Sequence, residues 1–181
     1  MLFTKYFALL AATFAVQATA YPAAFASAPE AIAHLDPISE SIENVSQMIN
    51  QSPGGISELM MITNSIYDVC DKAKTSRKRI DGMAPLTKQE EIEGKPHLAR
   101  LFYGLTSAVK ATSSKVPLVK AVPGGTIIAK RVANRVGEEK AGLQDILKDK
   151  CSPEAYQDFL PIINDFDKEF GSLMLELSGG I

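Results

Sequence analysis

The chain has 181 residues, with 19 Lys and Arg against 21 Asp and Glu and a formal net charge of −2. This balanced, slightly acidic composition argues against a nucleic-acid-binding protein, whose basic face usually dominates its composition. The length suits one domain with a hydrophobic core once an N-terminal leader is set aside.

The first twenty residues have the pattern of a secretory signal peptide. Lys5 is the only charge before the apolar run FALLAATFAV, which leads to Ala18-Thr19-Ala20, an A-x-A cleavage site. At roughly 10 residues, the run is too short to cross a bilayer of about 30 Å. We therefore expect residues 1–20 to be removed and the rest of the chain to be secreted, with no transmembrane segment.

A segment of small residues and prolines follows, 21–31, which we expect to be a loose leader. Beyond it, apolar residues recur in steps of three and four, the spacing of amphipathic helices. This spacing predicts five helices, over residues 35–49, 56–80, 98–112, 127–147 and 153–177. We therefore expect a single all-α domain over residues 32–178, a bundle of about five amphipathic helices.

The connector before the third helix, residues 83–96, contains the sequence Thr87-Lys88-Gln89-Glu90. Its Thr and Glu have the spacing of a capping box, in which each side chain bonds the free backbone amide of the other residue. We expect a short helix to begin here and to break at Gly94 and Pro96.

Two Pro-Gly-Gly stretches occur, SPGGISEL from Ser52 and VPGGTII from Val122. Neither follows a predicted strand or continues into Gly-Lys-Ser/Thr, so neither indicates a phosphate-binding loop. Proline ends one segment and glycine lets the chain turn into the next. We expect helices to start at Ile56 and Ile127, with Ile127, Ile128 and Val132 directed into the bundle.

The chain has two cysteines, Cys70 and Cys151, and two N-glycosylation sequons, at Asn44 and Asn50. In a secreted protein a single pair of cysteines is most simply one structural disulfide, and this is the pairing we expect. The two asparagines are expected glycan acceptors if the producing cell is eukaryotic.

No motif predicts a catalytic residue, a metal site or a cofactor. His34 and His97 lie far apart in the sequence, without neighbouring ligands for a metal. There is no GxSxG nucleophile elbow, so a hydrolase ranks third among the functional hypotheses.

The basic cluster Lys72, Lys74, Arg77, Lys78 and Arg79 is most simply a solvated helix face. Alternatively, the cluster contacts anionic head groups, or a protease cleaves the chain at Lys78-Arg79.

The order of segments resembles a known family. LDPISESIENVSQMI runs into SPGGISELMMITNSI, then come PLTKQEE and SAVKATSSKVPLVKAVPGGTIIAKRV, and the chain closes with PIINDFDKEFGSLMLEL. A Lys-x-Pro at Lys115-Val116-Pro117, a Pro-Gly opening the next helix, and an Ile-x-x-x-Phe spacing in the last helix are similar to the fungal hydrophobic surface-binding proteins and cell-wall galactomannoproteins. The resemblance implies a secreted helical domain that adheres to hydrophobic surfaces, helps to recruit a polyester-degrading esterase, or encloses fatty acids between its helices.

The chain departs from that family in its two cysteines, its charged middle and its lack of a Ser/Thr-rich stalk or anchor signal. The last departure favours free secretion over cell-wall attachment.

The leading hypothesis is a non-enzymatic secreted protein that binds a fatty acyl chain or a hydrophobic surface. Periodicity alone does not distinguish a filled core from a cavity, but the apolar stripes of the last three helices suggest the lining. The residues expected to face the enclosed space are Leu101, Phe102, Leu105, Ile128, Val132, Phe159, Ile163, Phe166 and Phe170. The second hypothesis is an effector-type protein that contacts a host or partner protein through the charged segment 72–96.

Overall fold

The computed structural model describes residues 27–179, so the expected signal peptide, residues 1–20, lies outside the described part of the chain. The described residues form helices and turns and no strand, which confirms the all-α prediction. The helices are α2 (Ala28–Gln51), α3 (Ile56–Asp81), α4 (Lys88–Ala121), α5 (Gly125–Lys150) and α6 (Pro153–Leu177). None of these helices is long and apolar enough to cross a bilayer.

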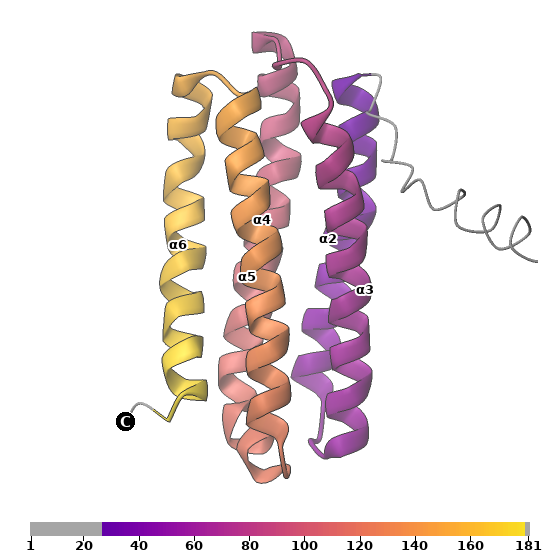
Figure 1. Cartoon of the computed structure of the whole chain (residues 1–181), viewed down its shortest axis with the longest axis vertical. Helices are drawn as coiled ribbons and strands as arrows, with labels where there is room; N and C mark the ends of the chain where they lie inside the picture. Colours follow the sequence, from indigo (N-terminus) through magenta and orange to yellow (C-terminus); the bar gives the residue numbers. More distant parts are fainter. Residues whose placement is uncertain (1–26, 180–181) are drawn as a thin grey trace, which may run out of the picture.

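The helices form two layers (Figure 1). In the first layer α4 packs between α2 and α6, and all three run in the same direction along the bundle. The second layer contains α3 and α5, which run in the opposite direction. Ion pairs fix the register within each layer, because Arg100 of α4 contacts Glu43 of α2 at 2.9 Å and Arg135 of α5 contacts Asp71 of α3 at 3.2 Å.

Three of the helices begin at a hydroxyl side chain that caps them. Ser27 and Ser152 accept hydrogen bonds from the third backbone N–H of α2 and α6, respectively. Thr87 and Glu90 form the predicted capping box at the start of α4. The hydrogen bond from the Thr87 backbone N–H lowers the pKa of the Glu90 carboxyl. Because Ser27 caps α2, this helix starts at Ala28, inside the segment 21–31 that we expected to be loose.

The expected break before the third helix is absent, because α4 continues through Gly94, Pro96 and Pro117 to Ala121. Both prolines are exposed, so the backbone carbonyl that each leaves without a partner can bond water. Gly94 is buried, and a side chain there would meet Ile32 of α2. Packing against α2 thus overrides the local tendency of these residues to end a helix.

The two glycine pairs act as turns, as predicted. Gly54, Gly55 and Gly124 have φ of 93°, 102° and 74°, a range that disfavours other residues. The turn at Gly55 starts α3 at Ile56, as expected, whereas α5 starts at Gly125 and not at Ile127. The side chain of Ile127 is 67% exposed, so the expectation that it points into the bundle is wrong.

The expected disulfide is also wrong, because Cys70 and Cys151 are free thiols. Asp71, next to Cys70, contacts Arg135 near the middle of α5, whereas Cys151 follows the last residue of α5. The 16 residues from Arg135 to Cys151 correspond to about 24 Å along the helix axis. A disulfide requires Cα atoms within about 7 Å of each other.

We expect both thiols to be present and unreactive in the folded protein. Burial raises the pKa of the Cys70 thiol to about 11 and that of the Cys151 thiol to about 11. At pH 8 only about one thiol in a thousand is then the reactive thiolate. Ellman's reagent should react slowly with the native protein and detect two thiols per chain in guanidinium without reductant. If the reagent detects no thiol until a reductant is added, Cys70 and Cys151 form the disulfide after all.

Any side chain at Gly125 should destabilise the α4–α5 turn. A Cβ there would lie 2.2 Å from the backbone oxygen of Val119. We expect Gly125→Ala to lower the free energy of unfolding by about 1–3 kcal/mol, the usual cost of overpacking. Gly171→Ala in α6 is the control, because a Cβ there meets nothing within 4 Å and should stabilise the helix by up to about 1 kcal/mol. Urea unfolding curves that do not separate the two variants would contradict this account.

Candidate functional site

The largest fully buried side chains lie where α4 meets α2 and α6. Phe102, Ile163 and Phe166 have no exposed surface at all, and the smaller apolar residues of α2 pack around the first two. Phe166 stacks on Phe170, with ring centroids 5.3 Å apart. The large aromatic side chains therefore fill this region and leave no space for a ligand.

The packing of α3 is much looser. Only Thr63, Cys70 and Ser76 of its 26 residues are buried, although the helix carries an apolar stripe. Ile62, Ile66 and Val69 of that stripe are only half-buried. The reason is that α3 packs along α2 and α5, while α4 packs mainly on α2 and α6. The inner face of α3 thus lies opposite α4 without filling the space between them.

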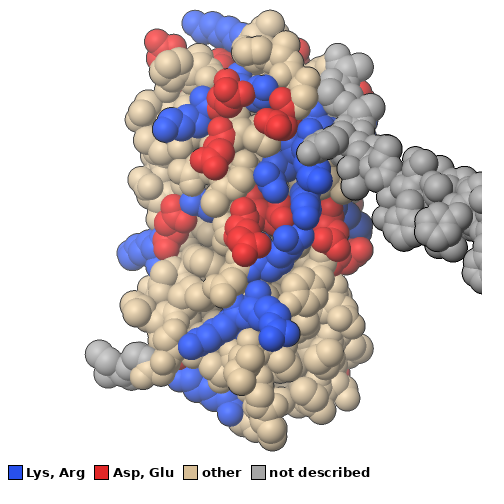
Figure 2. All heavy atoms as spheres, viewed as in Figure 1, with Lys and Arg blue, Asp and Glu red and all other residues tan. Residues whose placement is uncertain are grey.

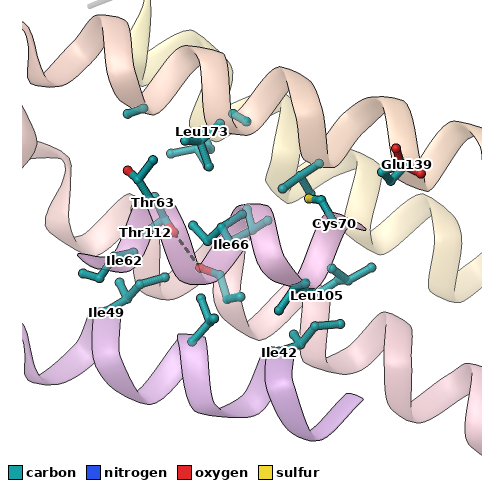
Figure 3. A pocket seen from close by; sticks show the side chains of 18 of the residues that line it. Ile42, Ile49, Ile62, Thr63, Ile66, Cys70, Leu105, Thr112, Glu139 and Leu173 are labelled. Carbon is teal, nitrogen blue, oxygen red and sulfur yellow. Dashed lines mark hydrogen bonds between the residues drawn. The ribbon is translucent and has the colours of Figure 1, made fainter. Parts of the chain in front are cut away.

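That space is a cavity of about 190 Å³ lined by residues of all five helices. Figure 3 shows Ile42 and Ile49 of α2, Ile66 of α3 and Leu105 of α4 surrounding it. Thr112 also lines the cavity, but its hydroxyl donates to the Ala108 carbonyl at 2.8 Å and needs no partner from the cavity. For scale, an apolar cavity of about 150 Å³ in another protein stays dry and binds benzene.

A charged group closes one side of the cavity, where α3 meets α5. The Glu139 side chain is only 8% exposed, and it contacts Arg77 of α3 at 3.2 Å and Arg135 of α5 at 3.3 Å. Gly142 makes room for this arrangement, because a Cβ there would lie 2.6 Å from the Arg77 guanidinium. The buried carboxylate is thus compensated by two cations and ties the edge of α3 to α5.

The cavity opens at the end of the bundle where α3 begins and α4 ends. Gly55 and Leu118 are the exposed members of its lining, and both lie at this end. Lys115 lines the same end and donates from Nζ to the Ser52 carbonyl at 3.1 Å. The opposite end is covered by the packed cluster around Phe159 and Leu147.

The structure divides the nine residues expected to line the site. Four lie on the cavity wall, namely Leu101, Leu105, Val132 and Phe170. Four others, Phe102, Phe159, Ile163 and Phe166, lie in the packed core, and Ile128 is half-buried on α5 outside the lining.

The sequence-based list omitted the contribution of α2 and α3, which includes Ile42, Ile49, Ile62, Ile66 and Val69. The sequence does contain a signal for the α3 wall. The apolar stripe of this helix consists largely of β-branched and small residues and includes the polar residues Thr63 and Ser76. Such a stripe is too small and too polar to fill the centre of a bundle.

The remaining sequence candidates lie at the surface. His97 contacts Asp36 at 2.7 Å, and no group of metal-ligating side chains occurs in residues 27–179. The sequon residues Asn44 and Asn50 are exposed on α2. The charged segment 72–96 covers the end of α3, the α3–α4 turn and the start of α4.

Comparison with known proteins identifies relatives of this fold. The family model described as hydrophobic surface binding protein A matches residues 28–149, in agreement with the resemblance seen in the sequence. No curated protein sequence is significantly similar to the chain.

Two solved structures of fatty-acid complexes share the fold at low sequence identity. Afmp4p in complex with palmitic acid is 15% identical, with a TM-score of 0.77, over 83% of this chain and 99% of that one. Ligand-binding domain 2 of the Penicillium marneffei MP1 protein, complexed with multiple arachidonic acids, is 12% identical, with a TM-score of 0.73, over 81% of this chain and 92% of that one.

Glu139 should contribute to stability because it links α3 to α5. Glu139→Gln leaves Arg77 and Arg135 without their shared carboxylate, and we expect a loss of about 1–3 kcal/mol in the free energy of unfolding. Glu138→Gln is the matched control, because that side chain is 69% exposed and 3.7 Å from Arg135. It should change stability by less than about 0.5 kcal/mol. If urea unfolding shows that Glu139→Gln changes stability as little as the control does, Glu139 has no structural role.

Proposed function

This chain belongs to the hydrophobic surface binding protein A family, and on that premise we propose that it binds a fatty acyl chain between its two helix layers without catalysis. The observation that carries the proposal is the apolar cavity between α3 and α4. The fatty-acid complexes of proteins with the same fold, palmitic acid with Afmp4p and arachidonic acids with MP1, support this ligand class.

Apolar burial alone supplies enough free energy for such binding. About 14 methylenes at ~0.8 kcal/mol each give a ceiling near 11 kcal/mol, from which the lost freedom of the ligand takes several kcal/mol. Micromolar affinity therefore requires only a modest slot and no reactive group.

The cavity widens most easily at α3. This helix buries few side chains, so moving it outward exposes less apolar surface than moving α4 or α6 would. Val69 and Ile66 of α3 then face the acyl chain on one side, and Leu101 and Leu105 of α4 face it on the other.

We further propose that the protein acts outside the cell, delivered by the signal peptide at residues 1–20. Association with the cell wall and recruitment of an esterase remain expectations from the family resemblance. A partner-contact function of segment 72–96 has less support, because Arg77 and Arg79 form ion pairs within the bundle, with Glu139 and Glu30.

Filling the cavity should prevent lipid binding. Ala108 lies on the cavity wall in the middle of α4, and Ala108→Phe should occupy the space while leaving the unliganded fold at least as stable. We expect native mass spectrometry to find a co-purifying fatty acid on the wild type and none on the variant. Added fatty acid should raise the melting temperature of the wild type alone.

The matched control is Ala141→Phe, which changes an exposed position of α5 and should behave like the wild type. If the wild type carries no lipid and shows no fatty-acid-dependent rise in melting temperature, the proposed function is wrong.

A further inference from the structure

Exposed apolar side chains gather at one end of the bundle. We call this the apolar end; it is the end at which α3 and α5 begin and α4 and α6 end, at the bottom of Figure 1. Among the described residues, six of the eight large hydrophobic side chains that are exposed lie within two turns of it: Ile56, Met60, Met61, Leu118, Ile127 and Leu175. Scattered single residues of this kind are ordinary, but a concentration at one end indicates an interaction surface.

The same turns carry an excess of positive charge. They contain the cations Lys115, Lys120, Lys130 and Arg131 and the anions Glu58 and Glu176. The apolar end thus has a net charge of +2 (4 − 2), in a chain whose total is −2. Figure 2 shows this distribution of charge on one face of the molecule. The lower part of that face is mostly uncharged, and the charged residues on it are mainly Lys and Arg, whereas most Asp and Glu lie higher.

Three of these cations, Lys120, Lys130 and Arg131, have no carboxylate partner in the described part of the chain. The fourth, Lys115, forms no ion pair within residues 27–179 either, but it donates a hydrogen bond to the Ser52 carbonyl. Elsewhere in the bundle, Arg77, Arg100 and Arg135 pair with carboxylates of neighbouring helices. Lys120, Lys130 and Arg131 therefore remain available for an external anion.

We propose that the apolar end docks on the surface of an anionic lipid bilayer. Ile56, Met60 and Ile127 then enter the boundary between head groups and acyl chains, and Lys130 and Arg131 contact the anionic head groups. Interfacial membrane binding requires this combination of exposed apolar side chains and flanking cations. A nucleic acid or an acidic peptide would satisfy the charges but leave the apolar residues in water.

Docking in this orientation places the opening of the cavity against the lipid. Gly55 and Leu118, the exposed members of the cavity lining, lie at this end. An acyl chain could thus pass between the bilayer and the cavity without crossing water. This last step rests on the proposed function, whereas docking itself does not.

The test is sedimentation of the full secreted chain with vesicles of phosphatidylcholine, with or without phosphatidylserine. Lys130→Glu/Arg131→Glu should weaken binding to the anionic vesicles by about tenfold or more, since each cation near such a surface contributes about 1 kcal/mol. The control Lys88→Glu/Lys148→Glu makes the same change of charge at exposed positions of the opposite end and should bind like the wild type. Met60→Ser/Ile127→Ser should also weaken binding, without changing its salt dependence.

Failure of docking and failure of lipid uptake can be separated with Ala108→Phe, which should still bind the vesicles while taking up no fatty acid. Equal binding of the wild type to neutral vesicles, or equal effects of the two charge reversals, would overturn the docking proposal. So would self-association through the apolar end, seen by analytical ultracentrifugation in place of vesicle binding.

Discussion

The site depends on one packing constraint: α3 packs mainly on α2 and α5, whereas α4 packs mainly on α2 and α6. In the first layer, aromatic side chains such as Phe102 and Phe166 are completely buried between the helices. Between the layers, the inner face of α3 carries no aromatic side chain and lines the cavity mainly with aliphatic and small residues such as Ile62, Ile66 and Val69. The first layer is therefore well packed, whereas a cavity remains between the two layers, and this cavity is the candidate site.

Ion pairs at the edges of α3 hold it in place where apolar packing does not. Arg79 contacts Glu30 of α2 at 2.8 Å, and Arg77 contacts Glu139 of α5 at 3.2 Å. Such pairs fix the register of a helix but contribute less to stability than a filled core. A helix held in this way can move outward at moderate cost, which suits a wall that must admit a long, flexible ligand.

Much of the fold could be predicted from the sequence, because helix formation and capping are local. The apolar spacing indicated all five helices, and Thr87 and Glu90 marked a helix start, although the expected short helix is the first part of α4. The exceptions have tertiary causes: α4 continues through Pro96 because it packs on α2, and Cys70 and Cys151 stay apart because they lie at different levels of the bundle. The cavity could not be predicted in detail, because periodicity indicates which face of a helix is buried but not whether the buried space is filled. Phe159, Ile163 and Phe166 were expected on the cavity wall but lie in the packed core, because large side chains fill the space around them.

The position of a bound acyl chain is the most direct test of this account. A crystal structure with a terminally brominated fatty acid would locate the bromine by its anomalous signal. Binding in the cavity should place the bromine peak between α3 and α4, in contact with Ile66 and Leu105. A bromine site confined to the outer surface, or one that displaces the core around Ile163 and Phe166, would contradict it.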